Sequence, residues 1–303
     1  MKNVSFKIEI LSVLLLISTV LYSQNEKDTF SIKNNEKSYV SIDFNFISDA
    51  VFMGRKDSIA APYLYPSITY HHNSGLYGKG SFSYLTKSNE SRIDLFLTTI
   101  GIDFTNKKFS GDFSATKYFF NSDSYNIISE VEADITGILR YDFDVFNVSV
   151  MASNYFSKNS QSDFFLSSEI SHDFITSNNK FQISPTIGVH FGSQNFYQEY
   201  VINKQIKQTG TGTGSGNGMG TGTGTVDTTT TVTEIVIEES EKFKAMAIEL
   251  SLPIWYIDNS FTISFLPVLA IPQSETNIIV NDTFQKENLK ETFYLMIGIG
   301  YRF

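Results

Sequence analysis

Apolar and polar residues alternate through most of the chain from residue 38 to its end. Neighbouring side chains on a β-strand point to opposite faces, so this period of two predicts strands with one apolar face and one polar face. We predict twelve such strands, and ten or fourteen would also fit the pattern. Their ranges are 38–51, 63–72, 76–85, 92–104, 109–120, 127–141, 145–156, 164–174, 181–191, 243–256, 261–271 and 292–303.

The connections between these runs alternate in length. Short segments such as Asn73-Ser74-Gly75 and Asp258-Asn259-Ser260 follow the even-numbered strands, and their composition is typical of tight turns. The segments after the odd-numbered strands are generally longer. Alternating connections predict an antiparallel meander whose short turns gather at one end and whose long loops gather at the other.

The last run shows the alternation most completely. One face carries only apolar and aromatic residues, and small, mixed or charged residues fall between them. The apolar set ends on the terminal residue: Phe293, Leu295, Ile297, Ile299, Tyr301 and Phe303.

This closing stretch resembles the last strand of Gram-negative outer-membrane β-barrel proteins. In that class, a terminal Phe preceded by apolar residues at every second position is the signal that the assembly machinery reads. The resemblance implies an all-β, closed antiparallel barrel over residues 38–303, with short periplasmic turns and longer external loops. It also implies outer-membrane lipid and the assembly machinery as partners. A soluble sandwich is the alternative fold.

The N-terminus predicts secretion. Lys2 and Lys7 precede a mostly apolar stretch from Ile8 to Leu21, and the chain turns polar after Ser23. A basic start and a short apolar core are typical of a signal peptide, here residues 1–23, whereas a spanning helix needs about 20 apolar residues. Residues 24–37 read as a polar lead-in. The chain has no Cys, which excludes disulfides and a lipoprotein anchor.

Composition agrees with a strand-based membrane protein. The mean hydropathy is −0.10, too polar for a helical membrane protein, yet aromatic residues make up 15 % of the chain. Membrane barrels concentrate such residues in two belts. The formal charge is −9, and loss of Lys2, Lys7 and Glu9 with the signal peptide leaves −10. This balance argues against nucleic acid as a partner.

The polar face of residues 127–141 indicates which face meets water. Glu130, Glu132 and Asp134 lie two apart, and such a face cannot enter hydrocarbon. They form either an acidic ladder that attracts cations or pairs with Arg140, Lys117 or Lys79 of neighbouring strands. In residues 243–256 we expect Met246 to face outward. The candidates for the lining of the lumen are Asp43, Glu130, Glu132, Asp134, Arg140, Glu169, Asp173 and Glu249.

Four segments depart from the simple pattern. The apolar parity of residues 92–104 changes after Leu97, which predicts a bulge or a misplaced boundary, and the outer face of 109–120 is ambiguous. Residues 195–241 form one long loop whose Gly/Thr stretch, 209–225, predicts a flexible linker. The charged segment Gly54 to Asp57 predicts a solvated external tip.

Candidate catalytic chemistry is sparse. His71 and His72 are adjacent and so point to opposite faces of a strand, and no Ser, His and acid set or metal-ligand spacing stands out. We therefore predict no catalytic, metal or cofactor site. The first functional hypothesis is a porin-like passive channel for small solutes with an acidic lumen. The alternative is a closed barrel that acts through its external loops, and a barrel enzyme comes last.

Overall fold

The computed structural model describes residues 37–57, 59–87, 90–158, 161–198, 200–202, 235–238, 240–275, 277–280, 283–286 and 289–303. The chain divides into two units, 1–33 and 34–303, and every described residue belongs to the second. The predicted signal peptide, most of the lead-in and the Gly/Thr linker lie outside the described residues.

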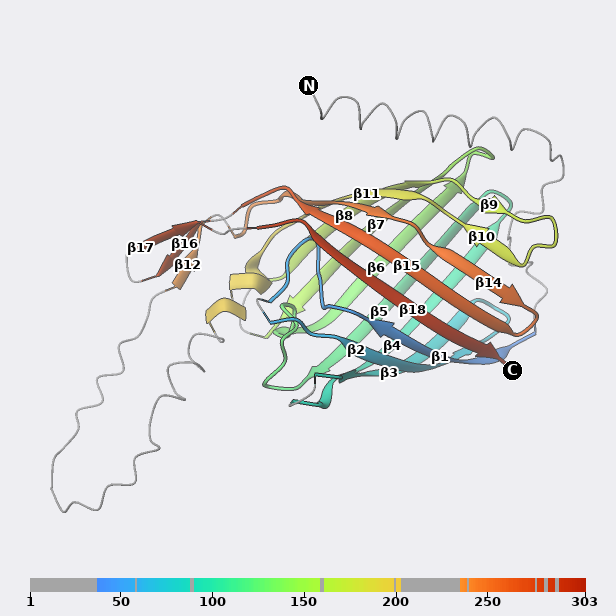
Figure 1. Cartoon of the computed structure of the whole chain (residues 1–303), viewed down its shortest axis with the longest axis horizontal. Coiled ribbons are helices and arrows are strands. Elements are labelled where there is room, and N and C mark those ends of the chain that lie inside the picture. The colour runs from blue at the N-terminus through green and yellow to red at the C-terminus, as the bar shows by residue number, and fades with distance from the viewer. Residues whose placement is uncertain are drawn as a thin grey trace, which may run out of the picture. The chain divides into compact units, whose positions relative to one another are not determined.

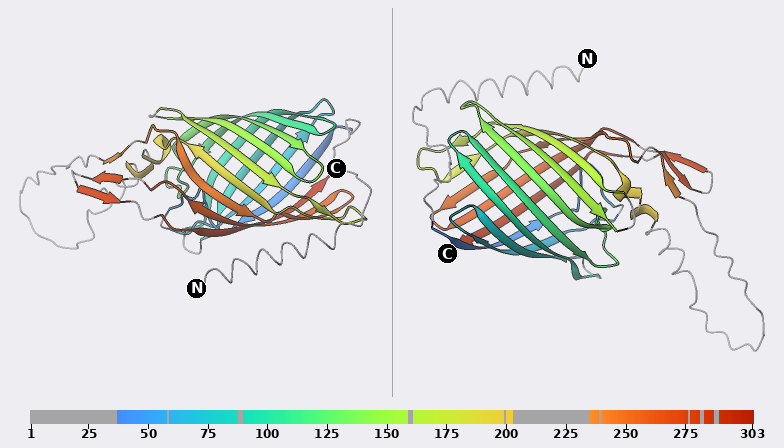
Figure 2. Two further views of the ribbon diagram at one scale, coloured as in Figure 1. Left: turned by 90° about the horizontal axis from the view of Figure 1, so that it is seen from above. Right: turned by 180° about the vertical axis from the view of Figure 1, so that it is seen from behind.

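The second unit is a closed antiparallel barrel of twelve strands (Figures 1 and 2). We call each of the twelve a wall, because three of them are interrupted and consist of two shorter strands. Nine walls are single strands: β1 (Tyr39–Ile47), β2 (Tyr63–His71), β3 (Leu76–Leu85), β4 (Arg92–Asn106), β5 (Phe109–Phe120), β6 (Val131–Asp142), β7 (Asn147–Ser157), β15 (Phe261–Pro272) and β18 (Thr292–Arg302). Three walls are interrupted: β8 (Asp163–Ser171) with β9 (Phe174–Ile175), β11 (Thr186–Gly192) with β10 (Phe181–Ile183), and β13 (Lys244–Ser251) with β14 (Ile254–Asp258). Pro185 and Pro253 lie in two of the interruptions, where a residue without an N–H breaks the ladder.

Each wall pairs with the next along the chain, and β18 pairs with β1 to close the cylinder. In that closing pair Ile42 lies opposite Tyr301 and Phe44 opposite Ile299. The prediction of twelve strands is confirmed. Closure leaves the main sheet without a free edge along these pairings.

A second, small sheet lies outside the barrel wall. β12 (Ile235–Ile237), which belongs to the predicted long loop, pairs with β16 (Asn277–Val280). β16 also pairs with β17 (Thr283–Lys286). Two of the long connections therefore meet in a three-stranded sheet.

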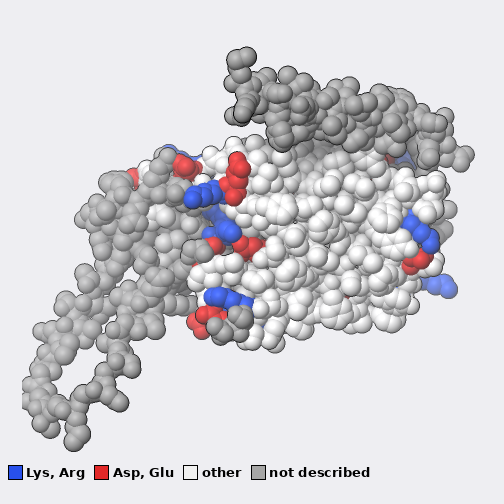
Figure 3. All heavy atoms as spheres, viewed as in Figure 1, with Lys and Arg blue, Asp and Glu red and all other residues white. Residues whose placement is uncertain are grey.

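The outer face of the barrel is apolar. Large apolar side chains are exposed on one parity of almost every strand. They include the closing set predicted above except Leu295, which is partly exposed, with Phe293 63 % and Phe303 69 % exposed. In β5 the outer residues are Phe109, Phe113 and Phe119, which settles the ambiguous strand. Described charged residues on the face shown in Figure 3 gather near its two ends, with an almost uncharged band between them. This is the pattern that a hydrocarbon layer requires.

Three bulges interrupt this alternation, and each leaves one residue unpaired. In β4, Ser83 and Tyr84 pair with Leu95 and Ile93, so Asp94 is the extra residue. The strand therefore has a bulge, but at Asp94 and not after Leu97, where the sequence placed the change of parity. In β6 and β13 the corresponding shifts leave Glu132 and Met246 as the extra residues.

The described part of the chain contains no helix that is long and apolar enough to cross a membrane. A short helix occupies residues 195–198 and 200–202, after β11.

Candidate functional site: a loop plug inside the barrel mouth

The inner face of the barrel is polar. The residues opposite in parity to the exposed apolar side chains are mostly Ser, Thr, Asn, Tyr, Gly and charged residues. Carboxylates outnumber basic groups among them: Asp43, Asp94, Asp103, Asp112, Asp134, Asp142, Asp163, Glu169 and Glu249 against Lys79, Arg92, Arg140, Lys244 and Arg302.

Of the two alternatives for the acidic residues of this segment, the ladder does not form, whereas Glu132 makes one of the predicted pairs. Glu130 lies in the turn before β6, and the bulge at Glu132 turns this residue away from the face of Asp134. Glu132 instead pairs with Lys117 at 3.2 Å, on the outer parity of β5. Only Asp134 is buried on the inner face, where it accepts hydrogen bonds from Tyr118 (2.8 Å) and Thr136 (2.6 Å). The ladder was wrong because a single extra residue inverts the parity of the side chains before it.

The other candidates keep the predicted face but are scattered. Asp43 accepts a hydrogen bond from Ser41 at 3.2 Å, and Arg140 is exposed on the inner parity of β6. Asp173 lies between β8 and β9, and its carboxylate accepts a hydrogen bond from Asn147 at 2.9 Å. The structure brings together only Glu169 and Glu249, which flank the same residue of β11.

The two adjacent histidines point to separate partners. His71 contacts Asp103 at 2.8 Å and stacks on Tyr39, whereas His72 bonds to Ser74 in the following turn. They do not share a site, as their spacing predicts.

The connection from β1 to β2 folds back into the barrel. Phe52 and Arg55 exchange both backbone hydrogen bonds, at 2.8 and 2.9 Å, around Met53 and Gly54. The φ angles of these two central residues are +47° and +79°, as in a type I′ hairpin turn. Glycine is favoured here, because the positive φ strains other residues and a Cβ would lie 3.1 Å from a side-chain carbon of Pro272 on β15. We call residues 48–62 the plug hairpin.

The predicted solvated tip was therefore wrong. Arg55 is 1 % exposed and Asp57 is 4 % exposed. The Arg55 guanidinium donates to the carbonyl of Ser274 at 2.7 Å and lies over the ring of Tyr197. Asp57 accepts hydrogen bonds from the amide of Ile59 at 3.0 Å and from the hydroxyl of Tyr200. The charges are buried because hydrogen-bonding groups of other loops surround them.

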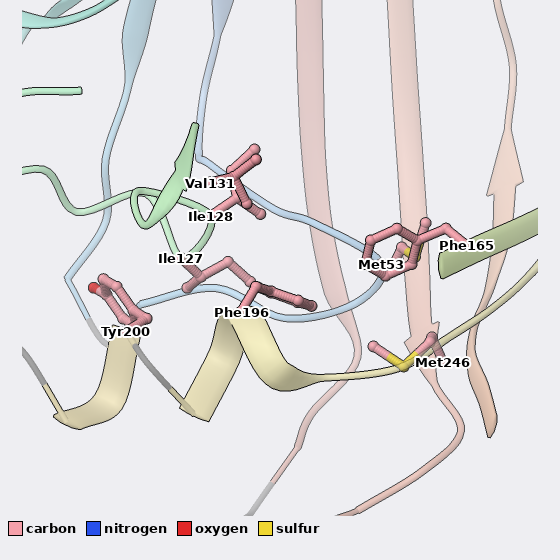
Figure 4. Close-up of a cluster of buried hydrophobic side chains, with 8 residues drawn as sticks. All are labelled: Met53, Ile127, Ile128, Val131, Phe165, Phe196, Tyr200 and Met246. Carbon is pink, nitrogen blue, oxygen red and sulfur yellow. The ribbon is translucent and has the colours of Figure 1, made fainter. Parts of the chain in front are cut away.

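The plug hairpin packs into an apolar core built by segments far apart in the sequence. Figure 4 shows Met53 near Phe165 and Met246, with residues of the β5–β6 connection and of the helix beside them. The buried members of this core are Met53, Ile127, Ile128, Val131, Phe165, Phe196, Tyr200 and Met246. Phe52 adds ring contacts to Phe165, at 5.3 Å between centroids, and to Phe196, at 5.4 Å. Since β8 lies across the barrel from β2, the hairpin reaches the far wall.

Met246 belongs to this core because of the bulge in β13. We expected it to face outward, but it is fully buried on the inside. The consecutive residues His190 and Phe191 of β11 pair with Ala247 and Ala245. Met246 is therefore the extra residue of the bulge and has no partner on β11.

Polar contacts fix the remaining edges of the plug. The carboxylate of Asp163 accepts hydrogen bonds from the amides of Asn195 and Phe196, at 2.8 and 2.7 Å, and so satisfies the first N–H groups of the helix. Asp49 accepts from Lys56 at 2.6 Å and from the amide of Ala61 at 3.0 Å, which ties the two sides of the hairpin together. Burial raises the pKa of Tyr200, whose hydroxyl also donates to Asp57.

The sequence carried a signal for this plug that the strand pattern concealed. Residues 50–53 read Ala-Val-Phe-Met, and residues 196–201 include Phe, two Tyr and Val. Such apolar residues in supposedly external loops require burial somewhere. Only the fold shows that both segments turn inward and meet.

No protein-family model matches this chain, and no curated protein is similar to it in sequence. Among solved structures, the KdgM porin aligns over 87 % of this chain and 99 % of its own, with 11 % identity and a TM-score of 0.43. The NanC porin aligns over 86 % and 98 %, with 8 % identity and a TM-score of 0.46. LpxR from Salmonella typhimurium aligns over 86 % and 99 %, with 9 % identity and a TM-score of 0.42. At these values the likeness does not extend to function.

The twelve-walled closed barrel, its apolar outer band and its closing strand define the class. The chain folds as a closed twelve-strand antiparallel β-barrel whose outer face has the apolar band of a membrane-spanning barrel.

Proposed function

We propose that the protein is a porin-like channel for small solutes whose loop end is closed by the plug hairpin. The observation that carries this proposal is the exposure of Lys79 and Arg140 on the inner parity of β3 and β6. Long charged side chains stay exposed inside a barrel only where water has room. The barrel therefore holds aqueous space beyond the plug.

The excess of carboxylates on the inner face supports an acidic lumen that favours cations. Charged groups lining a narrow pore select ions by sign. Asp43, Asp103 and Asp112 lie on the inner parity of β1, β4 and β5, outside the plug core. The proposal includes outer-membrane lipid around the apolar face, recognition of the β18 signal during assembly, and no catalytic step.

A closed barrel that acts through its loops is the second candidate. The plug core favours it, because Phe196, Ile127 and Met246 are fully buried and Arg55 is nearly so. With its loop end packed in this way, the barrel conducts ions only if the plug hairpin moves out of the lumen.

A reversible disulfide between the plug hairpin and β13 distinguishes the channel from the closed barrel. A Cβ on Gly54 would lie 3.3 Å from that of Ala247, slightly below the range of about 3.5–4.5 Å in disulfides. The chain has no native Cys, so the double variant Gly54→Cys with Ala247→Cys offers one pair. The two single variants are the controls.

The assay is single-channel recording in planar bilayers with a potassium chloride gradient. The channel proposal predicts discrete openings with cation selectivity for the reduced double variant, and none after oxidation. Replacing residues 50–60 by a short Gly/Ser turn should leave the channel steadily open. If folded wild-type protein stays silent at every voltage while that replacement conducts, the closed-barrel candidate holds instead.

A further inference from the structure

An acidic niche with no basic partner lies on the inner face beside the plug. Gly188 of β11 pairs with Glu169 on β8 and with Glu249 on β13, so the two carboxylates flank a residue without a side chain. Neighbouring strands are about 4.8 Å apart, which lets both carboxylates lean over the glycine. Glu169 accepts a hydrogen bond from Ser149 at 3.3 Å, and within the described chain neither carboxylate pairs with Lys or Arg.

A buried imidazole nitrogen is directed into the same niche. His190 is 8 % exposed, and its Nδ1 lies 2.8 Å from the hydroxyl of Ser167. Its Nε2 is buried without a hydrogen-bond partner, and the nearest carboxylate oxygen, on Glu249, is 3.6 Å away. A Cβ on Gly188 would lie 3.2 Å from this Nε2 and 3.7 Å from Oε1 of Glu169. Three acceptor groups thus border the space above Gly188.

We propose that this niche, formed by Glu169, Glu249, His190 and Gly188, binds the primary ammonium group of a small organic cation. A primary ammonium has three N–H donors and one positive charge, which match two carboxylates and one imidazole nitrogen. In the Nδ1–H tautomer His190 donates to Ser167 and its Nε2 accepts, and the ligand selects this tautomer. The charge of the ligand offsets the carboxylates that the protein leaves unpaired.

His190 Nε2 and Glu249 Oε2 lie 3.6 Å apart, so the side chain of Glu249 must move outward for both to accept from one ammonium. Hydrogen bonds from N–H to O are about 2.7–3.2 Å long, whereas zinc ligands lie about 2.0–2.2 Å from the metal. Acceptors around an ammonium are therefore further apart than ligands around a metal. Across the described ranges, no group of three His, Asp or Glu side chains is placed to hold a metal ion.

The niche also adjoins the plug hairpin. Its tip, Gly54, packs against Ala247, which pairs with His190. The side chain of Glu249 is 20 % exposed, so the niche keeps an opening on the inner face. The ligand class extends the proposed channel function, on which it rests for the route by which solutes arrive.

The test is equilibrium binding to purified full-length protein in detergent, measured by calorimetry, and it does not depend on conduction. The ligand is n-butylammonium. Tetramethylammonium is the matched control, because it carries the same charge and has no N–H donor. We expect saturable binding with one site for n-butylammonium and none for tetramethylammonium.

Two variants assign the binding to the niche. Glu249→Gln should weaken n-butylammonium binding at least tenfold, which is about the effect of one hydrogen bond to a charged group. Glu132→Gln changes a carboxylate on the outer face and should leave the binding unchanged. Heat-modifiable migration on gels shows that each variant is folded. Equal binding of tetramethylammonium, no effect of Glu249→Gln, or no saturable binding to wild type would each overturn the proposal. Binding by a protein that never conducts would overturn the channel and leave the niche standing.

Discussion

Truncating Met53 should release the plug hairpin from the barrel. Met53 is 7 % exposed and packs in the apolar core with Phe165 and Met246. Replacing a buried Met by Ala costs about 2–5 kcal/mol. The barrel walls keep their pairing, so we expect this cost to fall on docking of the hairpin. At RT of about 0.59 kcal/mol, the undocked population rises about 30-fold to several thousand-fold. Ala has a Cβ as Met does, so the positive φ at this position costs the same in both proteins.

Limited trypsin digestion of the folded protein measures this population. The bonds after Arg55 and Lys56 lie in the hairpin. Lys56 is exposed but stands between the buried Arg55 and Asp57, so cleavage of either bond needs the segment to leave the core. Where opening and closing are fast, the cleavage rate follows the open population. The turn at Lys107 and Lys108 supplies an internal reference site in the same molecule.

We expect Met53→Ala to accelerate cleavage at Arg55 and Lys56 by at least about 30-fold, with no change at Lys107 and Lys108. Phe44→Ala is the control, because Phe44 is 60 % exposed on the outer face. Wild-type cleavage as fast in the hairpin as in the reference turn would refute a docked hairpin. An unchanged rate in Met53→Ala would refute the packing argument.

Three further predictions concern the wall and the loops. Asp94→Ala removes a carboxylate that is 1 % exposed at the β4 bulge, and its partners Arg92 and Ser124 lose their contact with it. The free energy of unfolding should fall by about 3–5 kcal/mol, and gel migration should change at a lower temperature. Glu132→Gln breaks the pair with Lys117, in which both side chains are nearly half exposed, so the free energy of unfolding in a urea titration should fall by less than about 1 kcal/mol. Lys117→Met removes the other partner of the same pair and should have an equally small effect. Hydrogen bonds from Tyr125 and then Lys87 lower the pKa of Glu90, so Tyr125→Phe should raise this pKa toward its ordinary value in a carboxyl NMR titration. Because the folded pKa is lowered, the stabilisation from this contact is present above the ordinary pKa of Glu and is lost as the pH falls through the folded value.

The walls of the barrel could be predicted from the sequence because the lipid imposes a period of two on them. The outer face of β18, from Phe293 to Phe303, follows that period without interruption. A change of phase in β4 was also visible, although the apolar residues placed it after Leu97 and the bulge lies at Asp94. Its position in the strand needed the register of the pairing.

The interior could not be predicted in the same way. The bulges at Glu132 and Met246 each reverse a parity, and neither has a signal in its own sequence. The niche depends on three strands that bring Glu169, Glu249 and His190 to one glycine, which no spacing along the chain encodes. The plug hairpin was misread because its charged residues, Arg55 and Asp57, are buried by partners from other loops.

Cross-linking of the plug hairpin to β13 tests the central claim most directly. In folded Gly54→Cys with Ala247→Cys, mild oxidation should form an intramolecular disulfide almost completely, detected by mass spectrometry and by gel mobility without reductant. The control pair joins Gly54→Cys to Ala115→Cys, which lies on the outer parity of β5, and it should form none. If the first pair stays reduced and an impermeant maleimide labels both cysteines, although Gly54→Cys alone resists trypsin at Arg55 as the wild type does, the hairpin does not close the barrel.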